Sequence, residues 1–342
     1  MQTEPNNTAD PEQAAALPLC VDLDGTLTKS DMFWECAARS LARPAALIAG
    51  ILALPKGRAR VKAELSKRIA PTLAVDLLPY DQAVWDYVAR RRTNGAPVEL
   101  VSGADQALVD RVAAHTGLFD AAIGSDGIRN LTGNNKAAAL AERHPGGYAY
   151  IGNSSADLAP WAGAQEVLVA NASARLRQVL QDQATPFHEI SRRVPFGNRW
   201  RALTGARYWL FAVLVTLPAL LGQGALATAV AALPALALMA SGGAILGTLA
   251  RLDTLRADPV TRDGPLVSTQ LSIPKAIVLA GGQLAVGAGL AAVVPAPHLL
   301  GGGLVVAIVA ALLAGTARAA RVQTGILAVA LSVLILGIGS GL

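Results

Sequence analysis

The sequence predicts two structural parts: a doubly wound α/β domain with a helical cap, followed by an all-α membrane domain of about five spans. Three observations predict this division. Short apolar runs alternate with helical stretches in the first half, and residues 1–206 carry nearly all the charge. From Arg207 onward there are seven basic residues, three aspartates and no glutamate, between long runs of Leu, Ala, Val and Gly. This contrast is typical of a soluble half followed by a membrane half.

Five short apolar runs are expected to form the parallel strands of the first domain. Helical stretches such as 106–116 and 135–143 lie between most of them, and this alternation favours a Rossmann-like sheet. Ligands of such sheets bind at the carboxyl ends of the strands, so the polar residues at those ends are the candidates for function. The expected strands are 17–23, 97–101, 121–124, 148–152 and 166–169.

The domain boundaries follow from changes in composition. A polar tail at 1–16 is expected to be disordered, and the α/β domain is expected to span 17–182. A linker at 183–206 then leads to the membrane domain at 207–342.

Residues 30–94 interrupt the strand alternation after the first strand and are expected to form a helical cap. Five basic residues lie between Arg58 and Arg68. They form either a solvated helix surface or a cap surface that attracts an anionic substrate or anionic lipid. The sequence leaves both readings open.

Polar motifs follow three of the expected strands. Asp22-Leu23-Asp24-Gly25-Thr26 closes the first strand, and Ser102-Gly103 ends the second. Lys136 stands at the start of a later helix, and a loop from Asn153 to Asp157 ends the fourth strand. Two carboxylates as close as Asp22 and Asp24 repel each other unless a cation lies between them, and Mg²⁺ is the hard, oxygen-seeking candidate.

These motifs, in this order, resemble those of the haloacid dehalogenase-like phosphohydrolases, over roughly Leu17 to Asp182. The resemblance implies that Asp22 is an aspartyl nucleophile, which forms a phospho-aspartate, and that Asp24 is the general acid and base. It also implies a phosphate-binding set, which is Thr26, Ser102, Gly103 and Lys136.

The same resemblance implies a Mg²⁺ site formed by Asp22, Asp24, Asn153 and Asp157. The family usually has an acidic residue at the position of Asn153. An amide offers an oxygen ligand without a charge, so we expect weaker Mg²⁺ affinity. The alternative is that the phosphatase fold is kept only as a scaffold.

Five apolar stretches of the second half are expected to cross a bilayer, because a spanning helix needs ~20 residues. The basic loops between them all fall on the side of the first domain, as the positive-inside rule requires. The N-terminus has no signal-peptide pattern. We therefore expect an integral protein of the cytoplasmic membrane with a cytoplasmic N-terminal domain. The expected spans are 208–224, 225–250, 276–294, 299–317 and 322–342.

Segments 200–220 and 266–279 resemble the start of the UbiA-type intramembrane prenyltransferases. That resemblance implies transfer from a polyprenyl diphosphate, held through Mg²⁺ by two aspartate-rich motifs. The positions of the first motif are occupied by other residues, and Asp253 and Asp258 are off register. We therefore interpret this half as a degenerate, truncated prenyltransferase domain. The residues at the motif positions are Gly247, Thr248, Arg251 and Leu255.

The leading functional hypothesis is a membrane-tethered, Mg²⁺-dependent phosphomonoesterase, acting on a phosphorylated and lipid-linked substrate such as a polyprenyl-linked phosphate. One alternative is prenyl transfer, for which Asp253, Asp258 and Asp263 are the candidate acidic cluster. Another is a catalytically dead subunit that pairs with an intact prenyltransferase. Nucleic acid is excluded as a partner because no basic face with interleaved aromatic residues is present.

Overall fold

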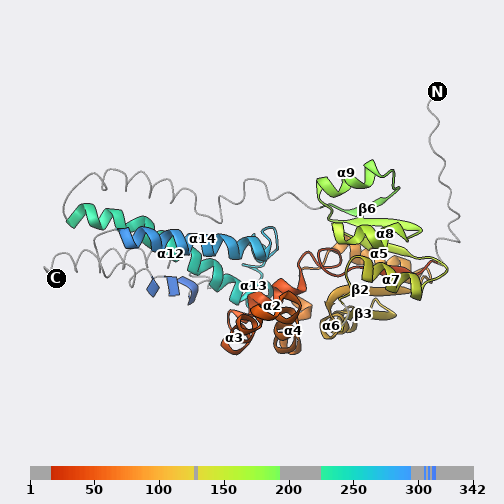
Figure 1. The fold of residues 1–342 in the computed structure, drawn as a ribbon, viewed down its shortest axis with the longest axis horizontal. Coiled ribbons are helices and arrows are strands. Elements are labelled where there is room, and N and C mark those ends of the chain that lie inside the picture. Colours follow the sequence, from red (N-terminus) through yellow and green to blue (C-terminus); the bar gives the residue numbers. More distant parts are fainter. Residues whose placement is uncertain are drawn as a thin grey trace, which may run out of the picture. The chain divides into compact units, whose positions relative to one another are not determined.

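The computed structural model describes residues 17–126, 130–192 and 225–293, with short helical pieces between 304 and 312 (Figure 1). The chain divides into two compact units. The first comprises residues 1–37 and 45–194, and the second comprises 38–44 and 195–342.

The first unit is built on a six-stranded parallel sheet with strand order β3-β2-β1-β4-β5-β6. β1 lies between β2 and β4, and its Leu19 is in register with Val98 on one side and Ala149 on the other. Both neighbours of β1 therefore come from distant parts of the chain. The strands are β1 (Leu19–Val21), β2 (Val98–Asp105), β3 (Ala121–Ser125), β4 (Ala149–Gly152), β5 (Glu166–Ala170) and β6 (His188–Ser191).

Helices cover both faces of this sheet (Figure 1). One apolar core contains Leu19 and Val21 of β1 with side chains of α5 and α6. The other contains Cys20 of β1 with side chains of α7, α8 and α9. Alternate residues of a strand point to opposite faces, which is why three consecutive residues of β1 serve two cores. The helices are α5 (Gln82–Thr93), α6 (Gln106–Thr116), α7 (Asn134–Arg143), α8 (Leu158–Ala162) and α9 (Ala174–Asp182).

The insert between β1 and β2 is helical, as expected. It contains α2 (Met32–Ser40), α3 (Pro44–Ala53) and α4 (Arg58–Ile69), with short 3₁₀ turns at Leu54–Lys56, Ala70–Thr72 and Val75–Leu77. The expected cap also included α5. Val84 and Val88 of α5 belong to the same apolar core as Met32 of α2 and Leu65 of α4.

The sequence predicted five of the six strands. The sixth, β6, falls within the segment that was expected to be a linker. Its sequence, His188-Glu189-Ile190-Ser191, contains a single apolar residue, because an edge strand with little buried surface needs no apolar run. β2 is longer than expected: Ser102 and Gly103 lie within it, where its pairing with β3 shifts register.

The second unit contains α12 (Ala225–Ala250), α13 (Leu252–Ala257) and α14 (Ile273–Val293). α12 and α14 pack closely through small residues. A Cβ atom at Gly242 would lie 2.9 Å from the carbonyl oxygen of Ala280, and one at Gly287 would lie 2.9 Å from that of Ala235. Close backbone approach of this kind is common between membrane helices.

A membrane domain of about five spans is not shown. Among the described residues, one helix, Ile273–Ala292, is long and apolar enough to cross a bilayer, with a mean hydropathy of 1.5 over its most apolar window. Length and composition alone do not separate such a helix from the core helix of a soluble protein. Two shorter apolar helices occur at Pro44–Lys56 and Pro234–Ala250. The expected spans 208–224 and 322–342, and most of 299–317, lie outside the described residues.

Two of the three aspartates suggested for prenyl transfer, Asp253 and Asp258, accept hydrogen bonds from the protein. Within the second unit, Nε of Arg39 donates hydrogen bonds to both carboxylate oxygens of Asp253, at 3.1 and 3.0 Å. Oδ1 of Asp258 accepts a hydrogen bond from the backbone N–H of Val260 at 2.9 Å. Both carboxylates therefore have hydrogen-bond partners within the second unit.

Candidate active site

The loop after β1 turns sharply at Gly25. This residue has a φ of +79°, a conformation that glycine adopts at little cost. A Cβ atom at Gly25 would lie 2.0 Å from Nδ2 of Asn153, so the loop after β4 lies directly against this turn. Glycine at this position therefore allows the loop after β1 to pack against the loop after β4.

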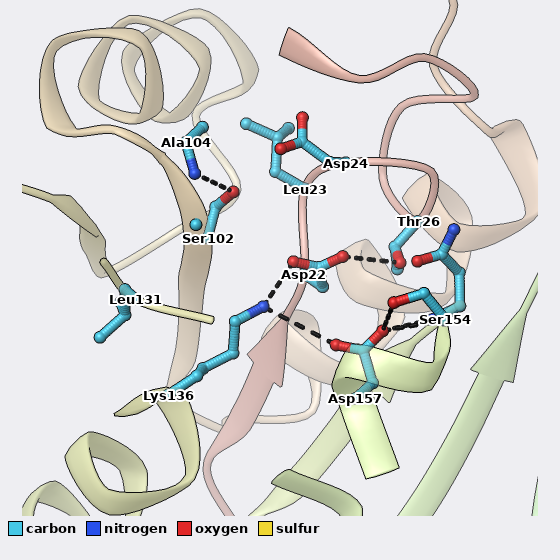
Figure 2. A network of polar contacts seen from close by, with 12 residues as sticks. Asp22, Leu23, Asp24, Thr26, Ser102, Ala104, Leu131, Lys136, Ser154 and Asp157 are labelled. Atoms are coloured by element: carbon cyan, nitrogen blue, oxygen red, sulfur yellow. Dashed lines mark hydrogen bonds and ion pairs between the residues drawn. The ribbon is translucent and has the colours of Figure 1, made fainter. Parts of the chain in front are cut away.

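A buried ion-pair cluster lies at the carboxyl ends of β1 and β4 (Figure 2). Nζ of Lys136 is 2.6 Å from Oδ1 of Asp22 and 3.7 Å from Oδ1 of Asp157. It also donates a hydrogen bond to the hydroxyl of Tyr150 at 2.9 Å. The hydroxyl of Thr26 donates to Oδ2 of Asp22 at 3.2 Å. These contacts fix both oxygens of the Asp22 carboxylate.

Asp157 holds the loop after β4 in place. Its Oδ2 accepts hydrogen bonds from the backbone N–H groups of Asn153 and Ser154, at 3.0 and 2.9 Å, and from the Ser154 hydroxyl at 2.9 Å. Its Oδ1 accepts from the Tyr150 hydroxyl at 2.7 Å. In the structure, Asp157 is a positioning residue for this loop and for Lys136, and its direct coordination of a metal stays a prediction.

The Asp24 carboxylate lies apart from this cluster (Figure 2). Its Oδ1 accepts a hydrogen bond from the backbone N–H of Met32, at the start of the cap, at 2.7 Å. Burial raises the pKa of Asp24 well above its ordinary value, and the nearby carboxylates of Asp31 and Asp22 raise it further. A raised pKa suits a group that must carry a proton to a leaving group.

The pKa of Asp22 is also raised, to about 6, mainly by burial, while the positive charge of Lys136 opposes the shift. Asp157 acts in the same direction as burial. Lys136 thus contacts two buried carboxylates, Asp22 and Asp157, while the half-buried carboxylate of Asp24 lies near Asp22. This local excess of negative charge is the electrostatic condition that a bound divalent cation relieves.

The phosphate-binding candidates of β2 lie beside this cluster. Ser102 is fully buried, and its Oγ accepts a hydrogen bond from the backbone N–H of Ala104 at 3.0 Å. A Cβ atom at Gly103 would lie 2.3 Å from the Thr132 side chain, so this backbone is closely packed. Nζ of Lys62, on cap helix α4, donates to the carbonyl oxygen of Gly103. The cap therefore contacts the site through a basic side chain.

The structure brings four predicted residues together, with Ser102 on the adjacent strand β2 (Figure 2); they are Asp22, Thr26, Lys136 and Asp157. Sequence reasoning missed Tyr150, which links Lys136 to Asp157. The strand pattern could have indicated this residue, because residues 150 and 152 of β4 lie on the same face of the sheet, and Gly152 directly precedes the loop that carries Asp157. The contact of Lys62 with Gly103 could not be predicted from the local sequence, because it depends on how α4 packs against β2.

The oxygen donors at this site suit Mg²⁺. Asp22, Asp24 and Asn153 offer carboxylate and amide oxygens, which hard cations prefer. Gly25 lies against the Asn153 side chain, which places this amide beside the turn that carries both aspartates. The residues present therefore fit a magnesium ion, and the identity of the cofactor stays a proposal.

A second polar cluster joins β1, β2 and the C-terminal end of α7, where the ligating atoms of Cys20, Glu99 and His144 are all within 4.8 Å of one another. Oε2 of Glu99 is 2.6 Å from Nε of Arg143 and 3.1 Å from Nε2 of His144. Burial raises the pKa of the Cys20 thiol to about 12, with Glu99 adding to the shift. This cluster is a buried network with its carboxylate already paired. Cys20 and Cys36 are both buried.

An aspartate pair after the central strand, a buried lysine and a helical cap define a Rossmann-like α/β domain with a site suited to phosphoryl transfer. Residues 19–159 match the family model described as "haloacid dehalogenase-like hydrolase". This match supports a hydrolase domain of that family in the first half of the chain, in agreement with the resemblance seen in the motifs. The UbiA-type resemblance of the second half is not confirmed.

Among curated proteins, the chain is similar to the "Uncharacterized protein y4nM" of Sinorhizobium fredii, with 31% identity over 283 residues. The similarity covers 80% of this chain and 54% of that protein, so the chain spans about half the length of its relative.

Solved structures show more distant similarity. An intermediate analogue complex of phosphoserine phosphatase is 16% identical, covers 48% of this chain and 90% of its own, and has a TM-score of 0.34. A protein of unknown function from Bordetella pertussis Tohama I is 15% identical, covers 51% of this chain and 99% of its own, and has a TM-score of 0.40.

Proposed function

We propose that the chain is a membrane-tethered, Mg²⁺-dependent phosphomonoesterase that acts through an aspartyl-phosphate on Asp22. The observation that carries this proposal is the buried contact between Lys136 and Asp22, at 2.6 Å, at the carboxyl end of the central strand. A nucleophilic carboxylate needs a fixed orientation, and Lys136 and Thr26 fix both of its oxygens.

In the proposed reaction, a carboxylate oxygen of Asp22 attacks the phosphorus of a phosphate monoester. The bond to the substrate oxygen breaks, and the alcohol leaves with a proton from Asp24. Asp24 then takes a proton from water, which attacks the phospho-aspartate and releases phosphate. A bound Mg²⁺ would neutralise the phosphoryl oxygens, while Lys136 and Ser102 would contact them. The raised pKa of Asp24 fits both of its roles.

The proposed location is a bilayer surface. The candidate span Ile273–Ala292 and the close packing of α12 against α14 support this placement. The substrate would be a phosphate monoester carried by a lipid, such as a polyprenyl-linked phosphate. This substrate class is inferred from the apolar second half of the chain.

The test uses the full chain in detergent with a generic aryl phosphate and a lipid-linked phosphate, each with Mg²⁺ and with EDTA. We expect Mg²⁺-dependent phosphate release from both, faster with the lipid-linked compound, and loss of activity by at least about 10³-fold in Asp22→Asn. Asp182→Asn on the exposed end of α9 is the matched control and should keep full activity. Phosphate release that persists in Asp22→Asn, or whose rate is the same with EDTA as with Mg²⁺, would contradict the proposal.

A further inference from the structure

Helix α3 of the cap packs on the domain with its small residues. Its buried positions are Ala46, Gly50 and Ala53. A Cβ atom at Gly50 would lie 3.0 Å from Cδ2 of Leu65 on α4, so the two helices approach closely there. This contact face leaves no room for large side chains, and the large apolar residues of α3 must point elsewhere.

Those large residues are exposed. Ile48 is 56% exposed, Ile51 54%, Leu52 69% and Leu54, in the following turn, 62%. A helix on the surface of a soluble domain normally does the reverse, with its large apolar side chains toward the core. Contiguous exposed apolar side chains on a folded domain mark an interaction surface. We call these four residues the α3 apolar face.

The charge around this face indicates what covers it. Between Arg43 and Arg68 the sequence contains seven basic residues and a single acidic residue, Glu64. Lys56, in the turn directly after α3, is exposed, as is Arg60 at the start of α4. Glu64 is itself paired with Arg60 and Arg68. An apolar face that is followed directly by the exposed Lys56, in a strongly basic part of the sequence, is complementary to an anionic lipid surface.

The length of α3 indicates how it meets that surface. Ten residues of α-helix extend only ~15 Å, whereas the hydrocarbon core of a bilayer is ~30 Å thick. The helix is therefore too short to cross and suits a position in the interface, parallel to the membrane plane. The candidate span Ile273–Ala292 in the same chain would hold the domain near a bilayer.

We propose that α3 lies in the interface of an anionic bilayer, with the α3 apolar face in the acyl boundary and Lys56 among the lipid headgroups. This inference rests on the membrane placement proposed above and adds a second, peripheral contact by the cap. Helix α4, which packs on α3, carries Lys62, whose Nζ donates to the carbonyl oxygen of Gly103 beside the phosphate-binding serine. Helix α3 at the lipid surface is thus connected to the candidate active site through α4.

The test places a nitroxide spin label at Leu52→Cys in the full chain. Cys20 and Cys36 are buried, so the label attaches to the introduced cysteine. Ala174→Cys, exposed on α9, is the matched control. Each variant is reconstituted into vesicles of phosphatidylcholine with phosphatidylglycerol, and collisions with oxygen and with a water-soluble nickel chelate are measured by electron paramagnetic resonance.

At an immersion of ~5–10 Å, we expect the oxygen-to-nickel accessibility ratio at position 52 to exceed that at 174 on the order of tenfold. Lys56→Gln should lower the ratio at 52 in anionic vesicles and leave it unchanged in pure phosphatidylcholine. High accessibility to both reagents, as in water, overturns the inference. Low accessibility to both also overturns it, because the face is then covered by protein, either this chain or a second copy.

The proposed membrane placement can fail separately. If the full chain does not float with vesicles of either composition, the placement itself is wrong. If the chain floats but the label at position 52 remains water-accessible, only the inference about α3 fails. Neither readout depends on phosphatase activity.

Discussion

Replacing Lys136 by methionine removes the positive charge of the site while keeping most of the side-chain volume. In the native protein, Nζ of Lys136 is 2.6 Å from Asp22 and 3.7 Å from Asp157, and the three side chains are 5%, 8% and 2% exposed. Methionine leaves two buried carboxylates without their cation. Removing one partner of a buried ion pair typically costs about 3–5 kcal/mol, so we expect a loss of this size at pH 7.5.

The cost should depend on pH in a defined direction. The pKa of Asp22 is already raised to about 6 in the native protein, against 3.8 ordinarily, and loss of Lys136 raises it further. The folded state therefore binds more protons than the unfolded state in this window, and stability falls as pH rises through it. At pH 4.5 the Asp22 carboxyl is largely protonated in the folded state, so the cost of Lys136→Met should be much smaller than at pH 7.5.

Amide hydrogen exchange measures the loss of stability locally, as the free energy of opening of β1. The experiment uses the full chain in detergent without Mg²⁺. Lys136→Met should lower it at pH 7.5, and Lys136→Met combined with Asp22→Asn should recover part of the loss. A matched control is Lys67→Met on α4, an exposed lysine of the cap, which should change the β1 value little.

Two results would refute the electrostatic reasoning. One is an equal cost of Lys136→Met at pH 4.5 and 7.5, which would attribute the loss to packing alone. The other is additivity of the two substitutions in the double variant, which would mean that Lys136 and Asp22 do not interact energetically.

Three further predictions concern the site. Mg²⁺ should raise the thermal midpoint more at pH 7.5 than at pH 5, because protons compete with the metal for Asp22 and Asp24, whose pKa values are both raised; a midpoint increase independent of pH would contradict this. Asn153→Asp should lower the Mg²⁺ concentration for half-maximal activity by about tenfold, since a carboxylate adds charge to the ligand set, and Asn153→Ser serves as its neutral control. Gly25→Ala should destabilise the domain by at least ~1 kcal/mol and reduce activity, because the φ of +79° disfavours a Cβ atom that would also displace Asn153, whereas Gly117→Ala, with a positive φ but open space, should cost stability only.

The fold of the first unit was predictable because its strands are buried on both faces. Such strands form continuous apolar runs, as in Tyr148–Gly152, and these runs are visible without a partner. β6 was not predictable on that basis, since it forms the edge of the sheet and contributes one apolar side chain. The extension of β2 beyond Val101 also escaped, because Ser102 and Gly103 have low strand propensity and are held by neighbouring segments.

The site was predictable where residues lie at strand ends and unpredictable where they meet through tertiary packing. Asp22 and Lys136 are recognisable from the order of the motifs along the chain. The role of Asp157 in holding backbone amides depends on the conformation of a loop, and the contact of Lys62 with Gly103 depends on how α4 folds over the sheet. Spacing along the sequence encodes neither.

The central position of β1 has a consequence for biosynthesis. β1 is synthesised before both of its neighbours, β2 and β4, and its Leu19 pairs with Ala149, which is made much later. The nascent β1 therefore remains without a strand partner while the whole cap is synthesised. Contacts between residues this distant in sequence also form slowly. A ribosome-bound chain that ends before Asp157 cannot assemble the ion-pair cluster. Codon choice and chaperone binding across residues 22–148 should accordingly affect the yield of folded protein more than changes in the later segments do.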